Sequence, residues 1–515
     1  MKINEKKLNG IVYTPKWIVH LILDNLDYRE NIYDKKIIDP ACGEGAFLSE
    51  VVERFFIDAK QKNIGNSEIE KALEKNIFGF DIDENAIEKC LAALDEIASK
   101  HGLESIKWQI LKTDSLDKDF VSKYFDIFDF VVGNPPYVRI QHLGTERRGK
   151  IQNDWRLCQK GSTDIFITFF ELGYSLLNKT GKLGYITPNT YLKTKAGEVL
   201  RDFIKASQSL KTLIDFEYYQ LFENATTYSV ITILDKNHRQ NTFALYKGNV
   251  ENVNYIDDVN IENLSSDNWI LTSNSVLKKL DAIEKRGMPL NKIAEIHVGI
   301  TTLSDDFYIF KEPKFDGDYA KITLKDGRAF QIEKDILKPI IKASVLKDPN
   351  EKQERYVIFP YRKMNNKHAI IPENDLKDKF PMTYEYFLSI RENLDKRDKG
   401  KPNPVAWYAF GRSQGLDTSF GKKILTSPIN LRPNFIVWEK EEFTFYAGYC
   451  IKFGGDLKLL AEHLNSPDME FYISNISRNY QNNYKSFAKS FIEKFGISDS
   501  SLISPQKQQQ LLLQI

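Results

Sequence analysis

Short apolar runs alternate with amphipathic stretches along the first 240 residues. Several runs, such as 36–39 and 128–133, are apolar at nearly every position, which is typical of strands covered on both faces. The order of the elements predicts an α/β fold with a doubly wound, mostly parallel, Rossmann-like sheet. The predicted strands are 36–39, 76–81, 108–111, 128–133, 182–187, 212–216 and 228–234, and the predicted helices are 44–58, 84–100, 164–178 and 191–206.

This alternation ends near residue 240. Residues 241–289 are polar and rich in Asn and Asp, which predicts a connector. From residue 290, strand-like runs, prolines and basic clusters follow without a β-α-β order. We therefore predict a first domain over 1–240 and a second, α+β domain over 290–515, as expected for a chain of 515 residues.

Charge is balanced over the whole chain but not along it. Lys and Arg number 72 and Asp and Glu 71, which excludes a uniformly basic nucleic-acid binder. Residues 321–363, however, hold 11 Lys or Arg against 6 Asp or Glu, and a further basic cluster spans 391–401. One basic face is therefore expected in the second domain.

Cysteine spacing and hydropathy indicate in which cellular compartment the protein is expected. The four cysteines lie far apart and form no Cys-x-x-Cys pair, so we predict reduced thiols, no disulfide and no metal site. No apolar run reaches the length of a bilayer span, and the N-terminus has no apolar stretch of signal-peptide type. We predict a cytoplasmic protein without a membrane partner.

A ligand site is predicted where the first three strands end. Asp39 ends the first strand, and Gly43 and Gly45 permit a tight turn before the helix. The segment matches neither the dinucleotide nor the triphosphate loop, so an ordinary β–α turn is the alternative. Asp81 follows the second strand, where a carboxylate can accept both hydroxyls of a ribose. The alternative for Asp81 is a helix cap, although Asp83 is better placed for that role. Asp114 follows the third strand and can accept from an adenine amino group; the three acids together suggest a nucleoside site.

The tetrapeptide Asn134-Pro135-Pro136-Tyr137 follows the fourth strand. Two prolines hold an extended loop. The Asn134 side chain and the Pro135 carbonyl offer two acceptors that can hold both hydrogens of an amino group, and Tyr137 offers a flat face for a base. The alternative is a rigid turn with a capping Asn.

The order of these motifs resembles the gamma-type, TaqI-like amino-group DNA methyltransferases of restriction-modification systems. The resemblance begins at Tyr13-Thr14-Pro15 and continues through the DPACGEG loop, FGFDID, TDSL and NPPY. Residues 164–171 and 181–201 resemble the next motifs of that family, and Phe222 its second base-contacting ring. Ser115 departs from the pattern, since the family usually has an apolar residue there, which puts one contact to an adenine ring in doubt.

The resemblance implies that S-adenosylmethionine is the methyl donor and that N6 of a flipped-out adenine in double-stranded DNA is the acceptor. Residues 1–240 would be the catalytic domain and 290–515 the target-recognition domain. Catalysis would rest on Asn134, Pro135, Pro136 and Tyr137. The target base or DNA would meet Tyr137, Phe222, Arg139 and Lys193. The cofactor-binding residues would be Tyr13, Thr14, Pro15, Asp39, Ala41, Cys42, Gly43, Gly45, Asp81, Ile82, Asp114 and Ser115.

Basic side chains extend the expected contact with DNA. Lys321, Lys325, Lys342 and Lys347 would hold phosphates, although a solvated surface charge is the alternative for each of them. The loop 138–163 would close over DNA or be an insertion. The expected form is a monomer, with a cognate restriction endonuclease as a possible partner that activity does not require.

Other activities compete with this interpretation. N4-cytosine methyltransferases usually carry Ser at the position of Asn134, and protein-glutamine and RNA amino methyltransferases share the NPPY loop but lack a large C-terminal domain. A DNA-binding specificity subunit with a degenerate methylase half is opposed by the complete set of Asp39, Asp81, Asp114 and Asn134. A nuclease fusion is not expected, since no Pro-Asp…Glu-x-Lys pattern is evident.

Overall fold

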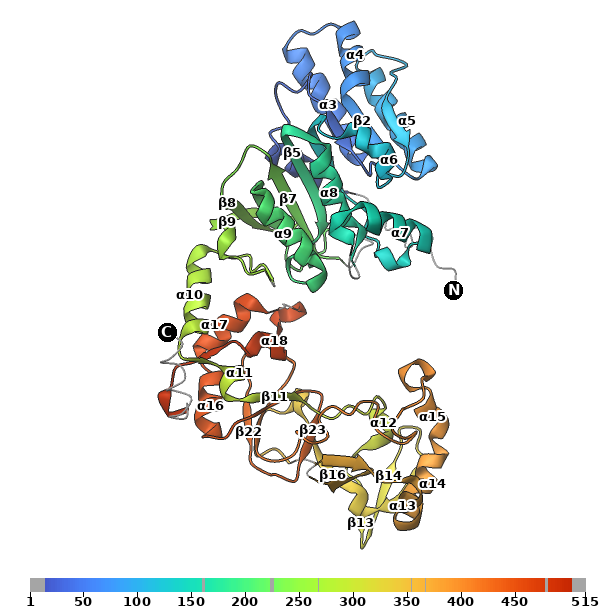
Figure 1. Cartoon of the computed structure of the whole chain (residues 1–515), viewed down its shortest axis with the longest axis vertical. Coiled ribbons are helices and arrows are strands. Elements are labelled where there is room, and N and C mark those ends of the chain that lie inside the picture. The colour runs from blue at the N-terminus through green and yellow to red at the C-terminus, as the bar shows by residue number, and fades with distance from the viewer. Residues whose placement is uncertain are drawn as a thin grey trace. The chain divides into compact units, whose positions relative to one another are not determined.

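The structure is a computed structural model that describes residues 14–159, 163–222, 227–266, 268–352, 354–365, 367–477 and 480–502. The chain forms two compact units, Met1–Leu277 (unit 1) and Lys278–Ile515 (unit 2), both drawn in Figure 1. Among the described residues, no helix combines the length and the apolar character that crossing a bilayer requires.

The described residues of unit 1 form one nine-stranded sheet. The first five strands in its order are parallel, β7 is antiparallel to both of its neighbours, β8 is parallel to β6, and β9 pairs antiparallel with β8. The mostly parallel, doubly wound sheet expected from the sequence is confirmed. The short link between the last two predicted strands suggested an antiparallel hairpin at one edge of the sheet; β6 and β7 do pair antiparallel, but β8 and β9 extend the sheet beyond them. The order is β3 (Gln109–Lys112), β2 (Ile77–Asp81), β1 (Ile37–Asp39), β4 (Phe128–Gly133), β5 (Leu177–Pro188), β7 (Ser229–Asp235), β6 (Leu210–Asp215), β8 (Thr242–Gly248) and β9 (Val253–Asn260).

Helices cover both faces of this sheet (Figure 1). Neighbouring strand residues point to opposite faces, so that Ile37 and Val132 belong to one hydrophobic core and Ile38 and Val131 to the other. Residues of α2, α3, α4 and α5 join the first core, and residues of α7, α8 and α9 join the second. The helices are α2 (Lys16–Asn25), α3 (Ala46–Gln61), α4 (Asn66–Asn76), α5 (Glu84–Lys100), α6 (Lys118–Val121), α7 (Thr145–Asp154), α8 (Ile165–Leu176) and α9 (Glu198–Ser207).

The structure differs from the predicted connector over 241–289. Residues 242–260 form β8 and β9, an antiparallel pair at the edge of the large sheet, and the two units divide at Leu277, inside the predicted connector. Phe243, Leu245 and Val259 are buried in the second core, while Tyr255 on the edge strand is exposed. An edge strand needs few apolar residues, which is why its polar sequence suggested a loop.

The described residues of unit 2 form several small sheets, mostly antiparallel, with β16 and β23 as a parallel pair. This arrangement fits the α+β character expected from the sequence. One sheet contains β11 (Glu295–Val298), β24 (Tyr449–Lys452), β20 (Lys423–Thr426) and β22 (Ile436–Trp438). A second contains β12 (Ile309–Lys311), β17 (Arg355–Ile358), β16 (Leu337–Lys342) and β23 (Thr444–Tyr446). A third contains β13 (Lys314–Asp316), β14 (Tyr319–Thr323) and β15 (Ala329–Glu333).

Short pairs and helices complete unit 2. The pairs are β10 (Met288–Pro289) with β26 (Gly496–Ile497), β18 (Tyr361–Met364) with β19 (Lys367–Ile370), and β21 (Ile429–Asn430) with β25 (Lys485–Ser486). The helices from the unit boundary onward are α10 (Asn274–Lys285), α11 (Leu290–Ile293), α12 (Asp305–Tyr308), α13 (Glu373–Lys379), α14 (Pro381–Ser389), α15 (Arg391–Asp395), α16 (Leu457–Leu464), α17 (Pro467–Ile476) and α18 (Lys489–Ile492).

Candidate active site at the strand ends of unit 1

A pocket of about 190 Å³ lies where β1, β2, β3 and β4 end, and we call it the strand-end pocket. Parallel strands bring their carboxyl ends to one edge, which is why four loops far apart in sequence meet there. The sequence-predicted residues that line it are Ala41, Gly43, Asp81, Ile82, Asp114, Ser115, Asn134 and Pro136. Half of the sixteen lining residues were therefore expected from the sequence.

The loop after β1 is held by the acid that ends β2. The Asp81 carboxylate accepts hydrogen bonds from the backbone N–H of Gly43, at 2.9 Å, and of Asp83, at 2.9 Å. Asp83 accepts from the N–H of Asn85 and caps α5, as the sequence suggested. Gly45 has φ +88° and a side chain there would meet Cys90, so this turn requires glycine. Asp81 thus faces the pocket and does not cap the helix.

The loop after β3 presents Asp114 to the same pocket. The Asp114 carboxylate accepts from the backbone N–H of Leu116 and from Nε of Arg147 at 2.9 Å. Ser115 is buried, and its hydroxyl donates to the Pro40 carbonyl. The serine that departs from the family pattern therefore ties the third loop to the first.

The loop after β4 places Asn134 at the pocket wall. Asn134 Nδ2 donates to Oγ1 of the buried Thr14 at 3.1 Å, and this bond orients the amide group. Gly133 has φ +151°, and a Cβ there would lie 2.6 Å from Asp39 Oδ1. A glycine before Asn134 therefore lets the loop 134–137 pass directly over Asp39.

Asp39 is buried beneath this loop, with 2% of its surface exposed. Burial, which the N–H of Ala41 partly offsets by donating to Asp39, and the nearby Asp81 together raise the pKa of its carboxyl to about 8. At neutral pH the carboxyl is therefore mostly protonated. A cationic ligand beside it would favour the ionised form.

The raised pKa of Asp39 makes folding stability depend on pH. The folded protein holds this proton up to about pH 8, whereas the unfolded chain releases it near 4. The stabilising effect is thus present below pH 4 and declines as the pH rises toward 8. We expect the stability of the wild type relative to Asp39→Asn to fall steadily from pH 5 to pH 8 in urea unfolding curves. A difference that stays constant with pH would contradict this assignment.

Two aromatic rings lie at and beside the loop 134–137. The rings of Tyr137 and Phe222 are 6.5 Å apart between centroids and meet edge to face at 66°. Burial raises the pKa of the Tyr137 hydroxyl well above its ordinary value, an effect that the Ser229 hydroxyl partly offsets, so the ring is neutral. The structure brings the two predicted rings together, but a base between them would require parallel planes about 7 Å apart.

The remaining predicted residues that the structure describes do not line the pocket. Pro15 precedes α2, and Pro135 is buried within the loop 134–137. The Cys42 thiol is buried against Cys90, which with burial raises its pKa. Arg139 is exposed near Asp164, and Lys193 is exposed after the short turn 189–192. Tyr13 lies outside the described residues.

Eight residues of the pocket wall were not expected from the sequence. They are Pro40, Asp83, Thr113, Val138, Leu143, Arg147, Ile165 and Phe169. The apolar stretch 164–171 was recognised as a motif, but its periodicity did not show which residues face a ligand. Leu143 and Arg147 come from the segment after the loop 134–137, where no local pattern indicates a pocket.

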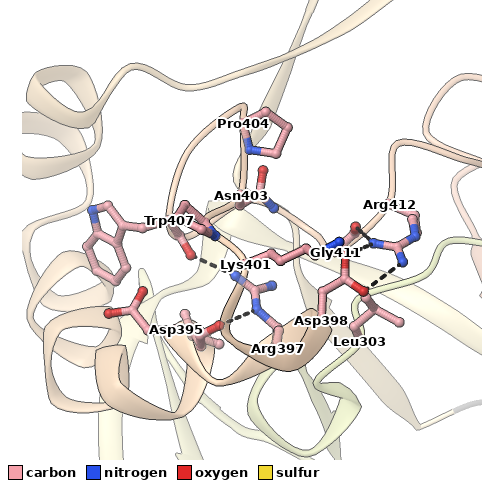
Figure 2. Close-up of a pocket in the computed structure, with 12 residues that line it drawn as sticks. Leu303, Asp395, Arg397, Asp398, Lys401, Asn403, Pro404, Trp407, Gly411 and Arg412 are labelled. Atoms are coloured by element: carbon pink, nitrogen blue, oxygen red, sulfur yellow. Dashed lines mark hydrogen bonds and ion pairs between the residues drawn. The ribbon is translucent and has the colours of Figure 1, made fainter. Parts of the chain in front are cut away.

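Unit 2 contains a polar pocket built by the basic segment 391–412, shown in Figure 2. This segment carries six Lys or Arg against three Asp or Glu. The buried Arg397 guanidinium donates to the carbonyls of Thr302, Ala409 and Trp407 and thereby fixes the loop. Arg412 is held by both oxygens of Asp398.

The turn at the start of this loop has an unusual backbone. Asp398 and Lys399 have φ of 50° and 62°, a region that residues other than glycine seldom occupy. Lys399 and Lys401 are exposed and make no side-chain hydrogen bond or ion pair within the described part of the chain. Strained backbone persists where the surroundings impose it, and it is enriched at functional sites.

The four lysines predicted to hold phosphates lie in a different part of unit 2. Lys321 is on β14 and exposed, and Lys325 forms an ion pair with Asp306 at 2.7 Å. Lys342 ends β16, and Lys347 is exposed five residues later. Their role remains a proposal.

Comparison with known proteins agrees with this site. Residues 75–222, from β2 to Phe222, match the family described as Eco57I restriction-modification methylase. The chain is 28% identical over 478 residues to the type II restriction enzyme and methyltransferase RM.Eco57I of Escherichia coli. That alignment covers 79% of this chain and 48% of the relative, so the chain spans about half of that protein's length.

A second relative is similar over nearly its whole length. The chain is 24% identical to the type II methyltransferase M.BstVI of Geobacillus stearothermophilus, with 98% of this chain and 92% of that protein covered. The solved structure of the type IIL restriction-modification enzyme MmeI in complex with DNA shares the fold, with a TM-score of 0.55 and 13% identity over 95% of this chain and 64% of that chain. The resemblance drawn from the sequence motifs is confirmed: the chain is similar to restriction-modification DNA methyltransferases, and residues 75–222 match the Eco57I family among them.

Proposed function

We propose that this protein transfers a methyl group from S-adenosylmethionine to N6 of an adenine flipped out of double-stranded DNA. The observation that carries the proposal is the meeting of Asn134 with Asp81 and Asp114 in one pocket. The amide at the pocket wall is oriented by Thr14, and the two acids stand at consecutive strand ends. The two acids could bind a donor nucleoside, and Asn134 could bind the amino group that accepts the methyl group.

The residues of the strand-end pocket fit S-adenosylmethionine by their chemistry. Asp81 would accept from the ribose hydroxyls, because each carboxylate oxygen keeps a lone pair beyond its bond to a backbone N–H. Asp114 would accept from the adenine amino group, and Ile82 and Phe169 would cover apolar surface. Asp39 would become ionised next to a cationic ligand.

The catalytic loop would act by holding the acceptor amino group. When bound, S-adenosylmethionine supplies a methyl group that its positively charged sulfur already activates. Asn134 Oδ1 and the Pro135 carbonyl would accept the two amino hydrogens and stabilise the positive charge that develops on the nitrogen. One of these hydrogens would then pass to water. The prolines reduce the motion of both acceptors, so the geometry is set before the reaction.

A base inside a duplex cannot reach this loop, so it would have to leave the stack. Tyr137 and Phe222 are the candidates to hold it. Their present edge-to-face contact would give way to parallel rings on either side of the base. Contact with the extruded base would therefore replace one aromatic contact by two.

The proposal is tested by incubating the protein with labelled S-adenosylmethionine and DNA, RNA or protein. We expect transfer to double-stranded DNA, and N6-methyladenine after digestion to nucleosides. N4-methylcytosine, or transfer to RNA or protein alone, would overturn it. Sequencing of methylated adenines in a host that expresses the chain would then give the recognition sequence.

We further propose that unit 2 is the target-recognition domain and that the basic segment 391–412 contacts DNA phosphates. Lys399 and Lys401 stand on a turn that Arg397 holds rigid, so little conformational freedom would be lost when they bind. The ion pair with Arg412 holds the pKa of Asp398 below its usual range, and the nearby lysines act in the same direction. The carboxylate stays ionised and keeps Arg412 oriented.

Replacing Lys399 and Lys401 together by alanine should weaken DNA binding in a salt-dependent manner. Each lost phosphate contact lowers the slope of log K against log salt by about 0.9, so a decrease of about 1.8 is expected. Lys396→Ala is the matched control, because Lys396 on the same segment is already paired with Glu392 at 2.8 Å. Fluorescence anisotropy at several salt concentrations measures both slopes. Equal slopes for the double variant and the wild type would refute the contact.

A further inference from the structure

Helix α7 brings a cation into the strand-end pocket that the motifs do not account for. Arg147, in the first turn of α7, lines the pocket, and its Nε donates to Asp114 Oδ2 at 2.9 Å. The two residues are 33 positions apart and come from different strand-end loops. The contact therefore joins the segment after the catalytic loop to the nucleoside end of the pocket.

The position of α7 is fixed by contacts with the loop that carries Asp114. Lys150 forms an ion pair with Asp117 at 2.8 Å, Lys118 donates to the Asp154 carbonyl, and Trp155 donates to the Leu116 carbonyl. Trp155 and Ile151 are buried in the second core of unit 1. The packing of α7 against this loop therefore places Arg147 next to Asp114.

Arg147 helps to fix the orientation of the Asp114 carboxylate. Oδ1 is held by the N–H of Leu116 and Oδ2 by Arg147, so the carboxylate plane has no free rotation. Two acceptor positions remain on its oxygens. The side chains of Arg147 and Asp114 are 38% and 33% exposed, and ion pairs this exposed add little to folding stability.

We infer that Arg147 is a positioning residue for the methyl donor: it holds the Asp114 carboxylate in the orientation that accepts the amino hydrogen of the donor's adenine. This inference rests on the proposed function and adds to it a residue outside the known motifs. Because it acts on one hydrogen bond, Arg147 sets the preference for an adenine ring over a purine that lacks the amino group. A hydrogen bond to a charged acceptor makes that preference about 10- to 100-fold.

Calorimetric binding of two product analogues tests the inference without any methyl transfer. The probes are S-adenosylhomocysteine and S-inosylhomocysteine, which carries an oxygen where adenine has its amino group. The wild type should prefer the first by about 10-fold or more. Arg147→Met should lower this preference at least fivefold and leave S-inosylhomocysteine binding within twofold of the wild type.

The matched control is Lys150→Met, which removes another ion pair between the same helix and the same loop. It should keep both affinities, since Lys150 does not line the pocket. Equal loss of both ligands in Arg147→Met, or an unchanged preference, would overturn the inference while leaving the proposed function intact. If the wild type binds neither ligand, the proposed function itself fails. Thermal unfolding of each variant separates misfolding from altered recognition.

Discussion

Replacing Asn134 by alanine should abolish methyl transfer while leaving donor binding nearly unchanged. The variant loses one of the two acceptors that would hold the amino group and stabilise the charge on its nitrogen, and loss of one such group typically lowers the rate by 10²- to 10³-fold. Donor affinity should stay within about threefold, because Asp81 and Asp114 lie on other loops. Single-turnover methylation of DNA at saturating donor measures the first quantity, and calorimetry measures the second.

Substitutions of Thr14 should produce smaller effects than Asn134→Ala. Asn134 Nδ2 donates to Thr14 Oγ1, so Thr14→Val should misorient the amide and lower the rate less than Asn134→Ala does. Thr14→Ser keeps the hydroxyl and should restore most of the rate. If Asn134→Ala methylates DNA at the wild-type rate, the proposed role of the catalytic loop is wrong.

Much of the fold and about half of the pocket wall followed from the sequence. Parallel strands end at one edge, so acids and glycines placed directly after apolar runs had to meet there. The predicted helix 84–100 coincides with α5 because Asp83 caps it and its buried residues recur with helical spacing. These features are local, and local patterns are what a sequence displays.

Where the structure departs from the prediction, tertiary contacts decided the outcome. The stretch 191–206 was expected to be one helix, but α9 begins only at Glu198. Arg201 binds the carbonyls of Tyr191 and Thr194 and thereby stabilises short turns before the helix. The contact between Arg147 and Asp114 could not be predicted from the sequence either, because it depends on how α7 packs against the loop after β3.

The sheet strands within the predicted connector were missed for a related reason. β9 carries Asn and Asp because it forms the outer edge of the sheet, where a strand needs one buried face only. Composition therefore suggested a connector where the structure has sheet. The buried side of the hairpin, Phe243 and Leu245 on β8, was the signal that an alternation analysis would have used.

Replacing Asp81 by alanine should act first on donor binding, in contrast to Asn134. In the proposed complex Asp81 accepts from the ribose hydroxyls, and it also holds the N–H groups of Gly43 and Asp83. Loss of hydrogen bonds to a charged acceptor and of this loop anchor should raise the dissociation constant of S-adenosylhomocysteine by about 100-fold. The rate at saturating donor should change much less, because the acceptor amino group is held elsewhere.

A donor analogue separates the two roles of Asp81. The 2′-deoxy form of S-adenosylhomocysteine cannot donate its missing hydroxyl, so the wild type should bind it more weakly than the normal ligand. Asp81→Ala should bind both forms about equally if the carboxylate meets the ribose. Asp81→Asn keeps one acceptor oxygen for the loop and should fall between the wild type and alanine. A deoxy penalty that persists unchanged in Asp81→Ala would mean that Asp81 only supports the Gly43 loop, and the donor would then be held by other residues of the pocket.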